Sequence, residues 1–168
     1  MKKFETYAEH SGKAVETDER FRHVMALTLD PSPNYKEGLI RCIMSREGDV
    51  QIKGYVDRSE LHTIYGNSLE HFVVGERLVI KNESEIIEEL GKDRDFIGLE
   101  DPDIWVDEKS GLKHVYFTIP LRNKLTEKIT THLGHAVGKE LDSLEMTMPV
   151  LMASERGRAK EVSIAPLN

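Results

Sequence analysis

Two adjacent carboxylates, Glu100 and Asp101, stand inside the phrase Gly98-Leu99-Glu100-Asp101-Pro102. A carboxylic acid can give a proton to a departing group when it is held in one geometry. Pro102 restricts the backbone after Asp101 and so favours a fixed geometry. Side chains alternate along an extended chain, so we expect Glu100 to point away from a site that Asp101 faces. The alternative interpretation is a turn at a strand entry, because Asp and Pro are common turn residues.

This phrase resembles the G-x-E-D-P-R motif of a five-bladed β-propeller family, the glycoside hydrolases and phosphorylases that act on β-mannosides. Four further segments resemble parts of that family in the same order. Gly38–Arg46 resembles its first-blade strand ending in arginine, and Ser59–Phe72 resembles its S-x-I-G-x-A-x-S-x-D-G-x-x-F stretch. His114–Thr118 resembles its Y-x-x-Y-T strand, and Lys160–Pro166 resembles the start of its third blade. The sequence departs from the family at Asp103, where arginine is usual, and at 67–70, where the D-G turn is missing.

The resemblance covers roughly residues 21–168 and implies about two blades plus the start of a third, with residues 1–20 as a lead-in segment. It implies that Asp101 is the catalytic proton donor. Candidate substrate-binding residues are Arg46, Ser59, Glu100 and Lys160. The guanidinium of Arg46 offers a fork of donors for sugar hydroxyls or phosphate, and its alternative is a solvated hairpin arginine. For Ser59 and Lys160 the alternative is a surface role.

The function that the resemblance implies is hydrolysis or phosphorolysis of β-linked oligosaccharides such as mannosides, by this chain or by a longer protein of which it is the N-terminal part. No cofactor is implied, and inorganic phosphate would be a co-substrate of a phosphorylase. Related propellers that cleave arabinose, xylose or fructose linkages also carry a D-P motif on the second blade. A non-catalytic carbohydrate-binding or interaction module on the same scaffold, and a small β-sandwich without enzymatic role, are the other hypotheses.

The elements that would position these residues are mainly strands. Short apolar runs bounded by Gly, Pro, Asn and Asp predict strands. The predicted strands are Phe21–Leu29, Gly38–Met44, Val50–Val56, Leu61–Tyr65, Leu78–Ile80, Ile104–Val106, His114–Pro120, Ile129–Val137, Met146–Met152 and Val162–Ala165. One short helix is predicted at Asn82–Leu90, because Ile86, Ile87 and Leu90 share a helical face. The predicted fold class is therefore all-β with one short helix.

A weak internal repeat supports two similar units. At a constant offset of 72 residues, Leu61, Gly66 and Leu69 recur as Leu133, Gly138 and Leu141. Repeats of about four short strands are typical of propeller blades. Because an incomplete ring leaves strand edges bare, we expect association with a complementary half or a homo-oligomer unless the protein is longer.

Composition limits the partners. Of the 168 residues 39% are hydrophobic and 32% charged, which is typical of a globular protein. A formal net charge of −7 argues against nucleic-acid binding, and no run approaches the roughly 18–20 apolar residues of a membrane span. Cys42 is the single cysteine, so no internal disulfide forms, and its apolar neighbours predict a buried thiol. The N-terminus lacks an apolar signal region, and we expect a cytoplasmic protein.

No metal site is expected. His132 and His135 are separated by three positions in a predicted strand, which places them on opposite faces of the sheet. Trp105 and Tyr116 are of the type that stacks on sugar rings, although a lone tryptophan in a strand is more often part of a core.

Overall fold

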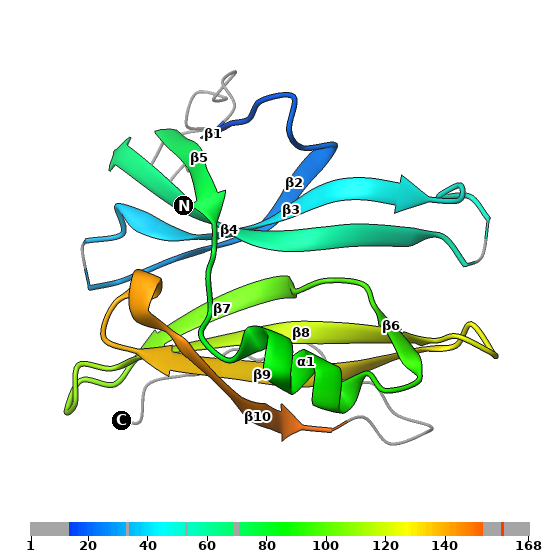
Figure 1. Ribbon diagram of the computed structural model, residues 1–168. Coiled ribbons are helices and arrows are strands. Elements are labelled where there is room, and N and C mark those ends of the chain that lie inside the picture. The colour runs from blue at the N-terminus through cyan, green and yellow to red at the C-terminus, as the bar shows by residue number, and fades with distance from the viewer. Residues whose placement is uncertain (1–13, 33, 53, 69–70, 153–158, 160–168) are drawn as a thin grey trace, which may run out of the picture.

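The structure, a computed structural model, describes residues 14–32, 34–52, 54–68, 71–152 and 159. The fold is mostly β: two sheets lie one above the other, and a single helix, α1 (Glu83–Leu90), packs beside the second sheet (Figure 1). This confirms the predicted strand-rich class with one short helix. Within the described residues, no helix has the length and apolar character needed to cross a membrane.

The first sheet, sheet A, is a curled sheet with the strand order β1-β5-β4-β3-β2. Its strands are β1 (Val15–Glu16), β2 (His23–Leu29), β3 (Glu37–Glu47), β4 (Val56–Ser68) and β5 (His71–Arg77). The strands β2 to β5 pair antiparallel in chain order, and β1 adds a short parallel pair at the β5 edge. Sheet A is therefore a four-stranded meander with one added strand, and that strand lies within the segment 1–20.

The second sheet, sheet B, repeats the four-stranded meander. Its strands are β6 (Arg94–Phe96), β7 (Glu100–Val106), β8 (Lys113–Asn123), β9 (Ile129–Gly138) and β10 (Glu145–Leu151), with a 3₁₀ turn at Leu141–Ser143 before β10. The strands β7 to β10 pair antiparallel in chain order, and β6 pairs with the far end of β8. The two meanders thus follow each other along the chain, and β2 and β7, the first strand of each, are neighbours in space.

Two predicted strands are wrong. Residues 50–52, 54 and 55 belong to the turn between β3 and β4, and β4 begins only at Val56. Leu78–Ile80 forms an irregular connection from β5 to α1, and Leu78 and Ile80 are buried by packing and not by strand pairing. The predicted strand Val162–Ala165 lies outside the described residues.

At the start of the helix, Asn82 adopts a left-handed φ of 63° and gives no side-chain cap. Its side-chain amide donates instead to Glu145 Oε1 at 3.1 Å.

Alternation along the strands divides the core into two clusters. The larger cluster fills the space between the sheets, where Leu39 and Leu61 of sheet A meet Val115 and Phe117 of sheet B. The smaller cluster covers the opposite face of sheet A and contains Ile40, Cys42, Ile64, Phe72 and Val74. Burial raises the pKa of the Cys42 thiol to about 12, so this cysteine is the inert structural thiol that its apolar neighbours predicted.

A charged cluster joins the two sheets at one end. Arg58 of β4 binds both carboxylate oxygens of Asp95 in β6, at 3.0 and 2.7 Å, and donates to the carbonyl of Phe96 at 2.7 Å. Arg122 of β8 contacts Asp95 Oδ2 at 2.7 Å and Glu47 Oε2 of β3 at 3.1 Å. The Arg58 hydrogen bond lowers the pKa of Asp95, with a further contribution from Arg122.

A substitution of Asp95 tests whether this cluster stabilises the fold. Asp95→Asn should lower the free energy of unfolding at pH 7 by about 1–2 kcal/mol, because a bidentate, partly buried contact is lost. The native pKa of Asp95 is below its unfolded value, so the carboxylate stabilises the protein above that value and the stabilisation is lost as the pH falls. Urea titrations from pH 7 to about pH 2 should therefore show the wild type and the variant converging. The control Asp93→Asn removes an exposed carboxylate and should change stability by less than about 0.5 kcal/mol.

Candidate functional site

The carboxylates Glu100 and Asp101 are held by one arginine of the other sheet, Arg41 of β3. Its Nη2 lies 2.5 Å from Glu100 Oε1, and its Nη1 lies 3.0 Å from Asp101 Oδ1. Its Nε donates to Ser59 Oγ in β4 at 2.9 Å. One guanidinium therefore connects the centre of sheet A to the first residues of β7, and all three of its nitrogens are engaged.

The expectation that Glu100 and Asp101 point to opposite sides is wrong. Asp101 has a left-handed φ of 48°, and the pairing of β7 with β8 shifts register between Glu100 and Asp103. Such an irregularity interrupts the side-chain alternation of a strand and redirects the residues within it. Both carboxylates therefore face Arg41.

A close crossing of two backbones places this irregular segment. The N–H of Ser59 donates to the carbonyl of Ile97 at 3.3 Å, and Ser59 pairs in parallel with Gly98. A Cβ added to Gly98 would lie 2.0 Å from the Ser59 carbonyl oxygen, and its φ of 148° is one that side chains rarely adopt. The glycine of the G-L-E-D-P phrase is thus required for the approach of β7 to sheet A.

Burial separates Asp101 from its neighbours. The side chains of Arg41 and Glu100 are each 10% exposed, and the Asp101 side chain is 16% exposed. Among the described residues, the second carboxylate oxygen of Asp101, Oδ2, has no hydrogen-bond partner. Asp101 therefore has one oxygen fixed by Arg41 and a side chain that stays partly exposed, an arrangement that orients the carboxyl group.

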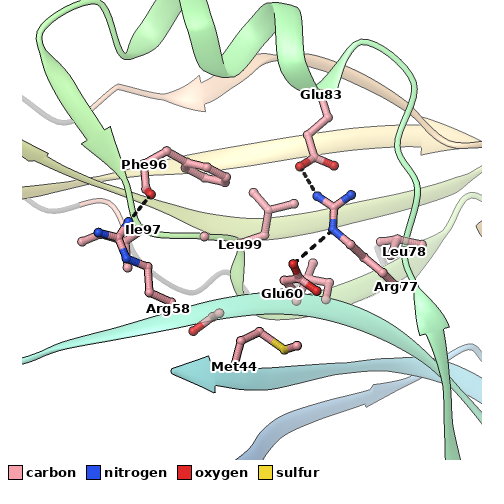
Figure 2. Close-up of a pocket in the computed structure, with 12 residues that line it drawn as sticks. Met44, Arg58, Glu60, Arg77, Leu78, Glu83, Phe96, Ile97 and Leu99 are labelled. Carbon is pink, nitrogen blue, oxygen red and sulfur yellow. Dashed lines mark hydrogen bonds and ion pairs between the residues drawn. The ribbon is translucent and has the colours of Figure 1, made fainter. Parts of the chain in front are cut away.

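A cavity of about 220 Å³ lies on the other side of the crossing, between sheet A, the β6–β7 connection and α1 (Figure 2). Its charged part consists of Arg58, Glu60, Arg77 and Glu83, with Arg77 Nη2 2.6 Å from Glu83 Oε1. Burial raises the pKa of Glu83, against the opposing effect of Arg77. The apolar lining consists of Met44, Leu61, Leu78, Phe96, Ile97 and Leu99. The cavity shares Ser59 and Gly98 with the crossing.

The structure brings three of the predicted site residues together and places Arg46 elsewhere. Ser59 and Glu100 belong to the Arg41 cluster, together with Asp101. Arg46 lies in a separate ion pair, in which Nε and Nη2 bind the two oxygens of Asp57 at 2.5 and 2.7 Å. The Arg46 hydrogen bond lowers the pKa of Asp57. Lys160 lies outside the described residues.

Arg41 was missed by sequence reasoning, although a signal for it exists. It is the one charged residue in the apolar run Gly38–Met44, and a strand interior holds an arginine only when its charge is paired. The run therefore indicated a buried partner of opposite charge, but it did not indicate which carboxylate.

The histidines point to opposite faces of sheet B, as predicted. His132 contacts Arg94 at 3.5 Å on the side of sheet A. On the other face, His135 contacts His114 at 3.0 Å and Thr147 at 2.9 Å. Burial lowers the pKa of both His132 and His135, which favours their neutral forms. The half-buried aromatic residues Trp105 and Tyr116 pack on this second face against His114 and His135.

No model of a known protein family matches the sequence, and no curated protein matches it.

Glycine substitutions test the crossing. Gly98→Ala should cost about 3 kcal/mol or more of unfolding free energy, because a clash with the Ser59 backbone adds to the unfavourable φ. Gly111 has a φ of 70° but open space around it, so Gly111→Ala should cost only the conformational term of about 1 kcal/mol. Chemical denaturation of both variants measures the difference, and equal costs would contradict a close crossing at Gly98.

Removal of the central arginine should destabilise the protein strongly. Arg41→Met leaves two adjacent carboxylates without their shared cation, and we expect a loss of about 3–5 kcal/mol. Arg77→Met removes an arginine with a half-exposed side chain and should cost less than about 1 kcal/mol. Urea denaturation of the two methionine variants provides the comparison, and similar losses would show that Arg41 is an ordinary surface cation.

Proposed function

We propose that this chain is the part of a β-propeller glycosidase or glycoside phosphorylase that supplies the proton donor, Asp101, for cleavage of a β-linked oligosaccharide such as a mannoside. The observation that carries the proposal is the state of Asp101: Arg41 holds one oxygen, and the side chain stays partly exposed. Asp101 also lies at the entry to β7, the first strand of its meander.

The architecture supports the propeller part of this proposal. Propeller blades are four-stranded antiparallel sheets arranged around a channel, each formed by consecutive strands. The meanders β2–β5 and β7–β10 have this form, they pack face to face, and their first strands are neighbours. A ligand at the inner end of β7 would therefore lie near the axis of the ring.

The contacts define what each residue would do. Asp101 Oδ2 would transfer its proton to the glycosidic oxygen of the departing sugar, while Arg41 fixes the orientation of the carboxyl group. Glu100 shares the same guanidinium, so it cannot act from the opposite side of the scissile bond. The attacking group must come from elsewhere, either as inorganic phosphate or as water activated by another carboxylate.

A second candidate function has a specific observation in its favour. In propellers that cleave arabinose, xylose or fructose linkages, the corresponding aspartate supports the other carboxylates. The engagement of Asp101 Oδ1 by Arg41 suits such a supporting role as well, because an arginine contact orients a carboxylate without requiring that it transfer a proton.

The activity test uses the 168-residue chain with manno-oligosaccharides, in the presence and absence of inorganic phosphate. Asp101→Asn should reduce the release of mannose or mannose phosphate by about 10²–10⁴-fold, because general acid catalysis is lost. The control Asp103→Asn changes a carboxylate on the same strand and should retain most of the activity. Unchanged turnover in Asp101→Asn would contradict the proton-donor role, and a moderate loss would favour the supporting role.

A binding measurement separates the enzyme from a carbohydrate-binding module. If calorimetry detects oligosaccharide binding while no product forms in either buffer, the chain is a binding module and the catalytic proposal fails.

A further inference from the structure

Two carboxylates share one arginine beside the cavity between sheet A and α1 (Figure 2). Arg77 of β5 lies between Glu60 of β4 and Glu83, the first residue of α1. Its Nη2 is 2.6 Å from Glu83 Oε1, and its Nε is 3.7 Å from Glu60 Oε1. Within the described part of the chain, no other lysine or arginine contacts either carboxylate. When both carboxylates are ionised, the group therefore carries two negative charges and one positive charge.

The neighbouring cations do not balance this excess. Arg58 lines the cavity, but Asp95 and Glu47 compensate its charge, each with a carboxylate oxygen 2.7 Å from Arg58 Nη2. His62 Nε2 lies 3.4 Å from Glu60 Oε2, while its Nδ1 lies 3.1 Å from a backbone carbonyl. Because a carbonyl can only accept, the neutral ring carries its single proton on Nδ1 and has none to give to Glu60. The excess negative charge therefore remains at the cavity.

Glu83 is the more buried of the two carboxylates. Its side chain is 12% exposed, compared with 37% for Glu60. Burial raises the pKa of Glu83, and the charge of Glu60 adds to this effect, while Arg77 opposes it. A charge that is removed from water needs a compensating charge nearby. A second cation close to Glu83 would complete the compensation that Arg77 gives only in part.

The rest of the cavity is apolar and has room for a small molecule. Its volume of about 220 Å³ exceeds the roughly 150 Å³ of an apolar cavity that admits benzene. Sugar hydroxyls would lose their water against such a lining, and the carboxylates would repel an anion. The cavity therefore suits a ligand that combines a positive charge with a compact apolar group. The apolar lining residues are Met44, Leu61, Leu78, Phe96, Ile97 and Leu99.

We propose that this cavity binds a small protonated amine, with its ammonium group between Glu60 and Glu83 and its apolar group in the apolar part. The ammonium donates charge-assisted hydrogen bonds to the two carboxylates. The apolar group, of about the size of a benzene ring, packs against the lining. This inference does not rest on the chemistry of Asp101. Its test needs no sugar, so it and the proposed function can fail independently.

Three ligands with the same ring and different charges test the proposal: benzylammonium, benzyl alcohol and benzoate. NMR titrations of the full 168-residue chain, at about pH 8 and so above the usual titration range of imidazoles, measure the affinities. Benzylammonium should bind at least about tenfold more tightly than benzyl alcohol, because it alone gains charge-assisted hydrogen bonds, and benzoate should bind most weakly. The methyl signals of Met44, Leu78 and Leu99 should shift. Any other order of affinities, or shifts confined to other residues, would overturn the proposal.

Substitutions of the charged residues separate the ligand site from the fold. Glu83→Gln should weaken benzylammonium binding about tenfold and leave benzyl alcohol binding unchanged. Glu60→Gln, at the more exposed position, should give a smaller loss of the same sign. The control Glu85→Gln removes an exposed carboxylate from the first turn of the same helix and should change neither affinity.

Arg77→Met gives an effect of opposite sign. Because it removes the cation that competes with the ligand for both carboxylates, it should strengthen benzylammonium binding about threefold or more. Weaker binding of benzylammonium to Arg77→Met would contradict the proposal. Equal effects of Glu83→Gln and Glu85→Gln would also contradict it, because the amine would then respond only to the overall charge of the protein.

Discussion

The buried charge of Arg41 is the constraint on which the arrangement of the two sheets depends. A guanidinium in the interior of a strand is tolerated only when carboxylates compensate its charge, and here both carboxylates come from the first residues of β7. The requirement acts on geometry as well as on energy. Because one rigid fork binds two adjacent residues, it determines where β7 begins and how its first residues are oriented relative to sheet A.

Two strained backbone positions belong to the same cluster. The close approach at Gly98 and the left-handed φ of Asp101 lie within four residues of each other, and both are unfavourable by themselves. They persist because the Ser59 backbone on one side and the Arg41 fork on the other hold the segment. Strain that is maintained by surrounding contacts is typical of positions where a side chain must be presented to a ligand, and Asp101 has the largest exposed fraction of the three charged side chains in this cluster.

The same four-stranded meander occurs twice, as β2–β5 in sheet A and as β7–β10 in sheet B. The Arg41 cluster lies where the first meander meets the second, because Arg41 comes from β3 and both carboxylates come from the first residues of β7. The catalytic candidate Asp101 therefore belongs to the junction between the two sheets.

The sequence by itself determined the class of fold and the chemical groups of the site. Short apolar runs specify strands such as β3 and β8, and Ile86, Ile87 and Leu90 specify the helix, because these patterns depend only on local geometry. Only the tertiary structure decided that Arg41, Ser59, Glu100 and Asp101 meet. They come from three strands, their contacts span up to 60 residues of chain, and the irregular backbone that turns Glu100 and Asp101 to one side arises from the crossing at Gly98. Local patterns carry no information on such a crossing, so alternation predicted the wrong side for Glu100 and passed over Arg41.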